Sequence, residues 1–142
     1  MYYDINKLTE VLKTHADYLR TGDMSKRADL SNADLSNADL SNADLSNADL
    51  SNADLSYANL RNADLSYADL RDADLSYADL SNADLSYADL RDANLYGANL
   101  TAAWLQNTEI KETNLINANL SGAHLNGAIL PRKIELAEAS NG

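Results

Sequence analysis

Aspartate is the residue type that most often could do chemistry in this chain, and it recurs at five-residue intervals. Asp29, Asp34, Asp39 and Asp44 begin a series in which Asp or Asn stands before most of the leucines in the middle of the chain. Carboxylate oxygens bind Ca²⁺, but this ion takes about six to eight converging oxygens, and a straight column of aspartates offers few to each ion. We therefore expect weak, screened ion binding, with no specific metal site and no cofactor.

The two histidines do not complete a catalytic group. His15 falls among apolar residues at helical spacing, so we expect a packed structural histidine. His124 has no Ser, Cys or second His that the predicted fold brings to the distance of a catalytic triad. The chain also has no cysteine, no glycine-rich phosphate loop and no zinc-binding pair of histidines. The sequence therefore predicts a protein that is not an enzyme.

Aromatic residues stand at outward positions where the pattern otherwise places Asp or Asn. Grouped aromatic side chains are typical of binding hot spots. The alternatives are that Trp104 is covered by the C-terminal tail or packs on its neighbours. The candidate interaction patch consists of Trp104, His124, Tyr67 and Tyr87.

The elements that position these residues follow from a five-residue repeat. Every fifth residue from Leu30 to Leu130 is leucine, except Ile110, which gives twenty-one units. On an α-helix, steps of five residues leave about 140° between leucines, so no apolar stripe forms. In a plain strand, an odd repeat sends alternate leucines to opposite faces. A short extended piece and a polar corner such as Ser31-Asn32, whose side chains can bond nearby backbone, keep Ala and Leu inside a narrow coil.

The outward residues indicate how many units form one coil. A basic residue followed by an acidic one recurs every twenty residues, and tyrosines recur with the same interval. Four units per coil align each set in a column, with coils ~4.8 Å apart, whereas three units would leave the charged pairs unaligned. About five coils follow, in a rod ~25 Å tall. The predicted charged ladder consists of Arg71, Asp72, Arg91, Asp92, Lys111 and Glu112.

The run from Ala28-Asp29-Leu30 through Ala128-Ile129-Leu130 resembles the pentapeptide-repeat family, over about three quarters of the chain. The resemblance implies an all-β solenoid, a right-handed quadrilateral parallel β-helix with the central leucine and the preceding alanine inside. The segment 12–22, continued by Arg27-Ala28-Asp29-Leu30, looks like the helical lead-in found before many bacterial repeats of this kind.

The same resemblance implies two kinds of function. Most members of the family have no known function, and a minority are acidic DNA mimics that bind type II topoisomerases and protect or inhibit them. Those members usually carry Phe at central positions and dimerise through a C-terminal element, whereas this chain has no Phe and a short polar C-terminus. A DNA-mimicking modulator of gyrase is therefore the alternative to a rod that binds proteins or spaces them.

The N-terminal segment predicts an α-helical cap over the first coil. Asp4 is a candidate N-cap and Gly22 a candidate C-terminal stop. Stacked repeats need such caps for solubility. The polar face mixes acidic and basic residues, which disfavours a membrane-surface helix. The predicted apolar face consists of Ile5, Leu8, Leu12, His15 and Leu19.

We expect three segments: a helical cap at 1–27, the β-helix at 28–130 and a C-terminal tail at 131–142. Pro131 ends the pattern because proline cannot donate a ladder hydrogen bond. Ile134 and Leu136 are expected to fold back over the last coil, with the end of the tail disordered. An exposed last coil favours edge pairing, so we expect a monomer or a C-terminal dimer.

The net charge of −11 belongs to the rod, where residues 28–130 include sixteen acidic and four basic residues. Direct nucleic-acid binding is disfavoured because phosphate contacts need Lys or Arg. A basic protein partner is favoured by long-range steering, although the same charge would also keep a repetitive rod in solution. No apolar run reaches the roughly eighteen residues of a membrane span and no signal peptide opens the chain, so we expect a bacterial cytoplasmic protein.

The stretch from Ser31 to Leu55 consists of five identical Ser-Asn-Ala-Asp-Leu units. Identical units specify register weakly, and natural duplication and deliberate insertion would look alike. We expect this stretch to lengthen the rod without forming a unique site. The sequence as a whole predicts a non-enzymatic, acidic interaction or spacer module.

Overall fold

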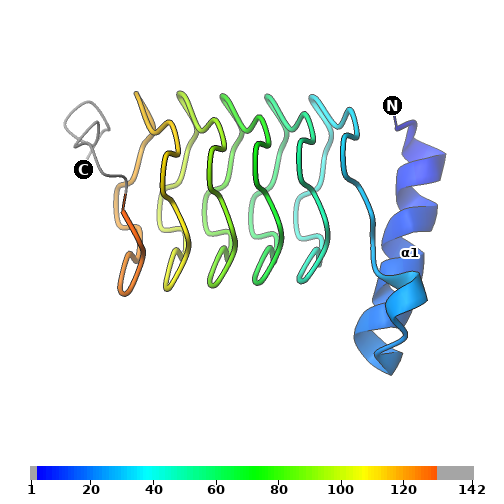
Figure 1. The fold of residues 1–142 in the computed structure, drawn as a ribbon. Coiled ribbons are helices and arrows are strands. Elements are labelled where there is room, and N and C mark those ends of the chain that lie inside the picture. Colours follow the sequence, from blue (N-terminus) through cyan, green and yellow to red (C-terminus); the bar gives the residue numbers. More distant parts are fainter. Residues whose placement is uncertain (1–2, 131–142) are drawn as a thin grey trace.

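The computed structural model describes residues 3–130, which form a rod with a helix across its first end (Figure 1). Helix α1 spans Ile5–Thr21, and the short 3₁₀ helix η1 spans Met24–Lys26. From Asp29 onward the described chain makes only isolated parallel β-bridges, one in each five-residue unit. The predicted tail, with Pro131, Ile134 and Leu136, lies outside the described residues.

Each β-bridge joins residues that are twenty positions apart. Asp29 pairs with Asp49, Asp49 pairs with Asp69, and the same interval holds at the other positions of the coil. Leu30 N–H donates to Asp49 C=O at 2.8 Å, and Asp49 N–H donates to Ala28 C=O at 3.0 Å. The twenty-residue period predicted from the outward residues is confirmed, and residues with the same outward position form columns along the rod.

Each corner is a β-turn whose second central residue has a positive φ. Across Ser31-Asn32, Ala33 N–H donates to Leu30 C=O at 3.1 Å, and Asn32 has a φ of 58°. A positive φ at this position alone is that of a type II turn. Of the seventeen non-glycine residues with positive φ among residues 3–130, nine are asparagine, which tolerates this conformation better than most residues. The corner asparagines are therefore favoured because their backbone tolerates the left-handed conformation. The sequence pattern predicts instead that their side chains bond nearby backbone.

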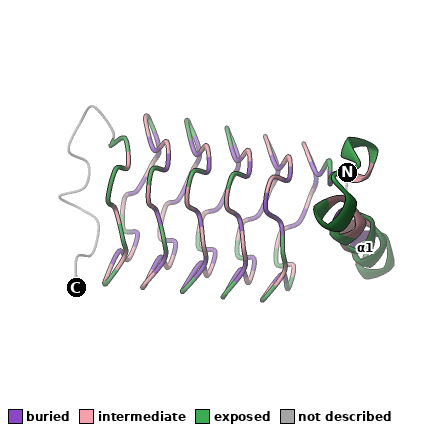
Figure 2. Cartoon of the chain, turned by 90° about the horizontal axis from the view of Figure 1, so that it is seen from below, coloured by how far each residue is buried: buried purple, intermediate pink, exposed green. Residues whose placement is uncertain are grey.

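Leucine and alanine fill the interior of the rod. The central leucines from Leu30 to Leu100 are at most 2% exposed, and each fully buried leucine contributes about 1.5–3 kcal/mol. Figure 2 shows buried residues recurring in every coil, with exposed residues at the corners. The prediction that the central leucine and the preceding alanine point inward is confirmed over these coils.

Helix α1 begins and ends at the residues that the sequence predicted. Asp4 lies at the N-cap, and its carboxylate accepts a hydrogen bond from Lys7 N–H at 2.9 Å. Gly22 lies at the C-cap with a φ of 74°, and its N–H donates to Tyr18 C=O at 2.7 Å. The helix is thus closed at both ends by local hydrogen bonds.

Helix α1 contacts the first coil through Leu8 and His15, which are 4% and 0% exposed. Ala28 N–H donates to His15 Nδ1 at 2.9 Å, so Nδ1 is the acceptor of the ring. The other nitrogen, Nε2, is then the donor, and it lies 2.9 Å from Ser46 C=O. His15 therefore joins the helix to the coil through two buried backbone groups.

Two residues predicted for the apolar face of α1 are exposed. Ile5 is 70% exposed and Leu19 is 36% exposed, while Leu12 is partly buried. A helix of 17 residues is about 25 Å long, whereas one face of a coil, with about three extended residues, spans on the order of 10 Å. The ends of the helix therefore reach past the coil, and the prediction that Ile5 and Leu19 shield the core is wrong.

Replacing His15 with alanine tests the attachment of α1. The variant leaves Ala28 N–H and Ser46 C=O without their partner, and each buried unpaired group costs about 1–3 kcal/mol. We predict that His15→Ala lowers the free energy of unfolding by about 2–4 kcal/mol, measured by urea denaturation. Lys13→Ala, on the exposed side of the same helix, is the control and should change stability little. Equal losses in the two variants would contradict this role.

Candidate interaction surface

One column of the rod consists of aspartates followed by aromatic rings. β-Bridges join Asp44 to Asp64 and Asp64 to Asp84, and then continue to Trp104 and His124. We call these five residues the acid–aromatic column. Among residues 3–130, none of its aspartates makes an ion pair. The column therefore carries uncompensated negative charge up to the position where the aromatic rings begin.

The aspartates of this column also close the corners that follow them. Asp44 Oδ1 accepts from Ser46 N–H at 3.1 Å and from the Ser46 hydroxyl at 2.6 Å. The amides of the serines that follow Asp64 and Asp84 donate in the same way, at 2.9 Å. No described residue donates a hydrogen bond to Oδ2 of these carboxylates. One oxygen of each carboxylate is therefore open to solvent or to a partner.

Trp104 and His124 stack on each other at the end of the column. Their ring centroids lie 4.2 Å apart with an interplanar angle of 20°. Trp104 is nevertheless 44% exposed. One face of the indole is thus occupied by His124, and part of the ring faces solvent. The alternative that Trp104 packs on its neighbours accounts for one face of the ring. The other alternative, cover by the C-terminal tail, concerns residues outside the described part of the chain.

The tyrosines of the candidate patch form a separate stack. The rings of Tyr67 and Tyr87 lie 4.9 Å apart, nearly parallel at 3°, and they are 59% and 53% exposed. Within residues 3–130, no ring contact joins this pair to Trp104 or His124. The structure therefore brings the four predicted patch residues together as two pairs rather than as one cluster.

A second tyrosine stack lies at another corner of the coil. Tyr57 and Tyr77 stack at 5.1 Å, and Tyr96 meets Tyr77 edge to face at 5.5 Å. Burial, assisted by Tyr96, raises the pKa of Tyr77 above its usual value. Gly97 occupies the next corner position, where a Cβ would lie 2.7 Å from the Tyr77 ring. Glycine at this corner therefore leaves room for the ring.

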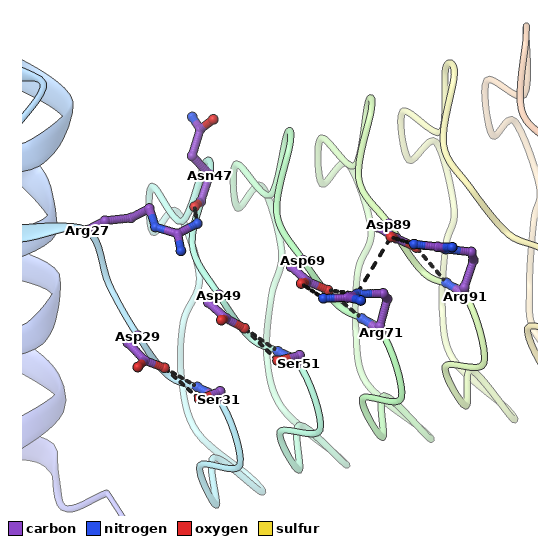
Figure 3. Close-up of polar contacts among 10 residues, drawn as sticks. All are labelled: Arg27, Asp29, Ser31, Asn47, Asp49, Ser51, Asp69, Arg71, Asp89 and Arg91. Carbon is purple, nitrogen blue, oxygen red and sulfur yellow. Dashed lines mark hydrogen bonds and ion pairs between the residues drawn. The ribbon is translucent and has the colours of Figure 1, made fainter. Parts of the chain in front are cut away.

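The arginines of the predicted charged ladder form ion pairs with aspartates that are not part of it. Arg71 does not pair with Asp72 but donates to both carboxylate oxygens of Asp69, at 2.8 and 2.5 Å, and lies 3.7 Å from Asp89 (Figure 3). Arg91 contacts Asp89 in the same way, at 2.9 and 2.6 Å. Asp72 lies at the left-handed position of its corner, with a φ of 59°.

The remaining ladder residues, Asp92, Lys111 and Glu112, make no ion pair among residues 3–130. Asp92 and Glu112 have φ values of 60° and 59°, the same left-handed corner conformation. The predicted ladder is thus a column of arginines bound to the preceding aspartates, with the corner acids outside it.

Arginine changes the electrostatics of the column that contains Asp69 and Asp89. The hydrogen bonds from Arg71 hold the pKa of Asp69 below its usual value. At Asp89, burial raises the pKa, but the hydrogen bonds and the charge of Arg91 outweigh it and the net shift is downward. This column is therefore partly neutralised, in contrast to the acid–aromatic column.

Among residues 3–130, no three His, Asp or Glu side chains are placed to hold a metal ion. The aspartate columns run parallel to the rod, and their oxygens do not converge on a common point. Neither histidine of the described chain is paired with a nucleophile. His15 forms hydrogen bonds with backbone groups, and His124 stacks on Trp104.

The repeat geometry has a counterpart among known protein families. The model for pentapeptide repeats matches in 8 copies, over residues 28–66, 63–101 and 93–130. The chain belongs to the pentapeptide-repeat family. Its repeat therefore places it among solenoid proteins with β-helical structures, which are generally structural or interaction modules.

Solved pentapeptide-repeat structures resemble the chain over most of the rod. One from the thylakoid lumen of Arabidopsis thaliana is 38% identical, covers 68% of this chain and 67% of its own, and gives a TM-score of 0.66. Rfr23 from the cyanobacterium Cyanothece 51142 is 38% identical, with 73% and 64% covered and a TM-score of 0.54. A pentapeptide-repeat protein from Nostoc is 34% identical, with 100% and 98% covered and a TM-score of 0.42. Comparison with curated protein sequences gives no match.

The role of the Asp and Asn side chains that precede the central leucines was not predicted from the sequence of this pentapeptide-repeat chain. At Asp29, Oδ1 accepts from both the amide and the hydroxyl of Ser31, at 3.1 and 2.6 Å, and these bonds lower the pKa of the carboxyl. The signal was present, because Ser stands two residues after most of the aspartates and such side chains bond the backbone two residues on.

Arg71→Gln tests the paired column through pH. A carboxyl whose folded-state pKa lies below the ordinary 3.8 stabilises the fold above that pH and ceases to do so as the pH falls through the lowered value. We predict a lower melting temperature for the variant at neutral pH, corresponding to a loss of at most ~1 kcal/mol in the free energy of unfolding, as for a surface ion pair. The difference in melting temperature between variant and parent should close in acid. Arg61→Gln removes an arginine with no ion pair among the described residues, and it should show no such gap. A gap that persists in acid contradicts the assignment.

Proposed function

We propose that this chain is a non-enzymatic, acidic rod that binds a basic protein partner through the acid–aromatic column. The observation that carries the proposal is the absence of ion pairs at Asp44, Asp64 and Asp84 within the described part of the chain, next to the exposed edge of Trp104. By contrast, Asp69 and Asp89 are paired with arginine. The acid–aromatic column thus keeps its charge for a partner, and it is the unpaired column that continues into Trp104.

The distribution of charge along the rod supports the same surface. Residues 28–92 include fourteen acidic and three basic residues, whereas residues 93–130 include two and one. Trp104 and His124 lie just beyond the acidic part. A basic partner would be steered by the carboxylates and anchored by the aromatic rings, which can also contact a cation.

The finer architecture is part of the proposal. The rod would be a right-handed quadrilateral β-helix of about five coils, with coils ~4.8 Å apart. Residues 1–27 would serve as its cap, 28–130 as the binding rod and 131–142 as a tail. The identical units from Ser31 to Leu55 would set the length of the rod, which is the spacer role considered from the sequence.

The cellular location stays a prediction. In the part of the chain that the structure describes, no helix has both the length and the apolar character that a membrane crossing needs. The neighbour from Arabidopsis thaliana is a protein of the thylakoid lumen. A bacterial cytoplasmic location, without membrane or nucleic-acid binding, is what we propose from composition and charge.

Modulation of a type II topoisomerase is the alternative that the family suggested, and a gyrase supercoiling assay separates it from the proposed role. Unchanged supercoiling at a molar excess of the chain excludes the alternative. Inhibition, or protection from a gyrase poison, would replace a general basic partner with gyrase.

Trp104→Asp tests the proposed surface with little risk to folding, because it restores the Ala-Asp-Leu pattern of the other units. We predict that immobilised chain retains a basic protein from a bacterial lysate, that salt releases this protein, and that Trp104→Asp retains several-fold less. Tyr77→Asn, which restores the Ser-Asn corner at another position, is the matched control and should retain as much as the parent chain. Equal retention by the two variants would contradict the proposed surface.

A further inference from the structure

The backbone edge of the first coil is open beside helix α1. In the second coil, Asn59 N–H donates to Ala38 C=O at 2.9 Å, and Leu40 N–H donates to Asn59 C=O at 2.7 Å. The equivalent N–H and C=O groups of Asp39 and Asp44 have no hydrogen-bond partner among residues 3–130. These groups point toward the N-terminal end of the rod, where a preceding coil would lie.

The helix side of the molecule covers other parts of this edge. Tyr3 N–H donates to Asp34 C=O at 3.3 Å, and His15 bonds Ser46 C=O. Residues 3–130 therefore supply partners on either side of the open segment but none within it. Unpaired edges of this kind are templates for another strand.

Burial marks the same opening. Ala38 and Ala43 are only partly buried, whereas the core alanines from Ala48 to Ala118 are at most 1% exposed. Between the start of α1 and this part of the coil lies a groove of about 280 Å³. Its lining includes Tyr3, Ile5, Leu8, Leu35, Ala38 and Asp39.

The charge of the groove defines what would fit it. Asp34 and Asp39 line it, and no lysine or arginine does. Asp39 is exposed, and its Oδ1 already accepts from Ser41 N–H at 3.1 Å, so the carboxylate is held in place. A groove lined by both apolar side chains and fixed carboxylates is complementary to a segment that carries both apolar and basic side chains.

We propose that this edge binds an extended segment of another protein with the pattern apolar–Lys/Arg–apolar, which adds one parallel strand to the first coil. The proposal concerns the open edge at Asp39, toward the other end of the rod from Trp104. It uses backbone groups and the Asp39 carboxylate, not the carboxylates of the acid–aromatic column, although Asp44 belongs to both surfaces. Strand addition of this kind draws affinity from main-chain hydrogen bonds and specificity from alternate side chains.

The register follows from the bridges that the rod already makes. Asp39 N–H would donate to the carbonyl of the residue before the basic one, and the amide of the residue after it would donate to Asp39 C=O. The basic side chain would then point outward beside the Asp39 carboxylate, ~5 Å away as between neighbouring strands. The flanking apolar side chains would point inward, the first over Ala38 and the groove, and the second at the margin of Leu40, which is itself 1% exposed.

The test uses the full chain and a labelled, end-blocked peptide, Gly-Ser-Ala-Lys-Leu-Ser-Gly, followed by fluorescence anisotropy. Asp39→Pro removes the free N–H at an edge position, where proline is tolerated because this N–H makes no ladder bond with residues 3–130. It also removes the Asp39 carboxylate and its hydrogen bonds from Ser41. We expect saturable binding by the parent chain and about tenfold weaker binding by Asp39→Pro. Asp54→Asn removes one charge in the second coil, and Trp104→Asp alters the other surface; both should bind the peptide like the parent.

A peptide methylated on the leucine amide keeps the folded protein unchanged and removes the donor to Asp39 C=O, so it should also bind about tenfold more weakly. Equal binding of the methylated peptide would show attraction by charge alone and overturn the proposal. Equal binding by a folded Asp39→Pro variant would show that neither the Asp39 N–H nor its carboxylate takes part, and would likewise overturn the proposal. So would the absence of saturable binding. Self-association of the peptide-free chain that Asp39→Pro abolishes would make a second copy the occupant, which also overturns it.

Discussion

The hydrogen-bonded register of twenty residues between successive coils is the constraint on which the rest of this structure depends. Each five-residue unit supplies one bridge, tied by pairs such as Leu30 N–H to Asp49 C=O and Asp49 N–H to Ala28 C=O. A unit this short must turn a corner at once, so its second corner residue adopts a left-handed backbone. Asparagine holds nine of the seventeen non-glycine examples in the described part of the chain. The leucine core, one side chain wide, is what this register leaves inside.

The same register places side chains of the same type above one another, which produces both repulsion between charges and columns that a partner could bind. Aspartates one above another repel, which the arginines at Arg71 and Arg91 relieve by contacting the carboxylates of Asp69 and Asp89. Where no arginine is supplied, as at Asp44, the charge remains for solvent or a partner. Aromatic residues placed twenty apart stack instead. Within each such column, neighbouring rings cover each other's faces and leave their edges exposed.

The repeat could be predicted from sequence because its signal is summed over many units. The spacing of leucine excludes a helix or plain strand, and the interval between Arg71 and Arg91 sets the coil. What could not be predicted depends on lengths and directions in space. Ile5 and Leu19 have the right helical phase, but the helix is longer than the face it crosses. The partner of Arg71 is Asp69 rather than the adjacent Asp72, which residue order alone does not reveal.

Disulfide trapping measures the register directly, since the chain has no cysteine of its own. With cysteines at the first corner positions of successive coils, Ser41→Cys with Arg61→Cys, a twenty-residue coil brings the two Cα atoms to about 5 Å, within reach of a disulfide. We predict rapid intramolecular oxidation of this pair and none of Ser41→Cys with Ser56→Cys, fifteen residues apart on a different face. Oxidation of the second pair in preference to the first would contradict the twenty-residue coil and with it the columns on which both binding surfaces depend.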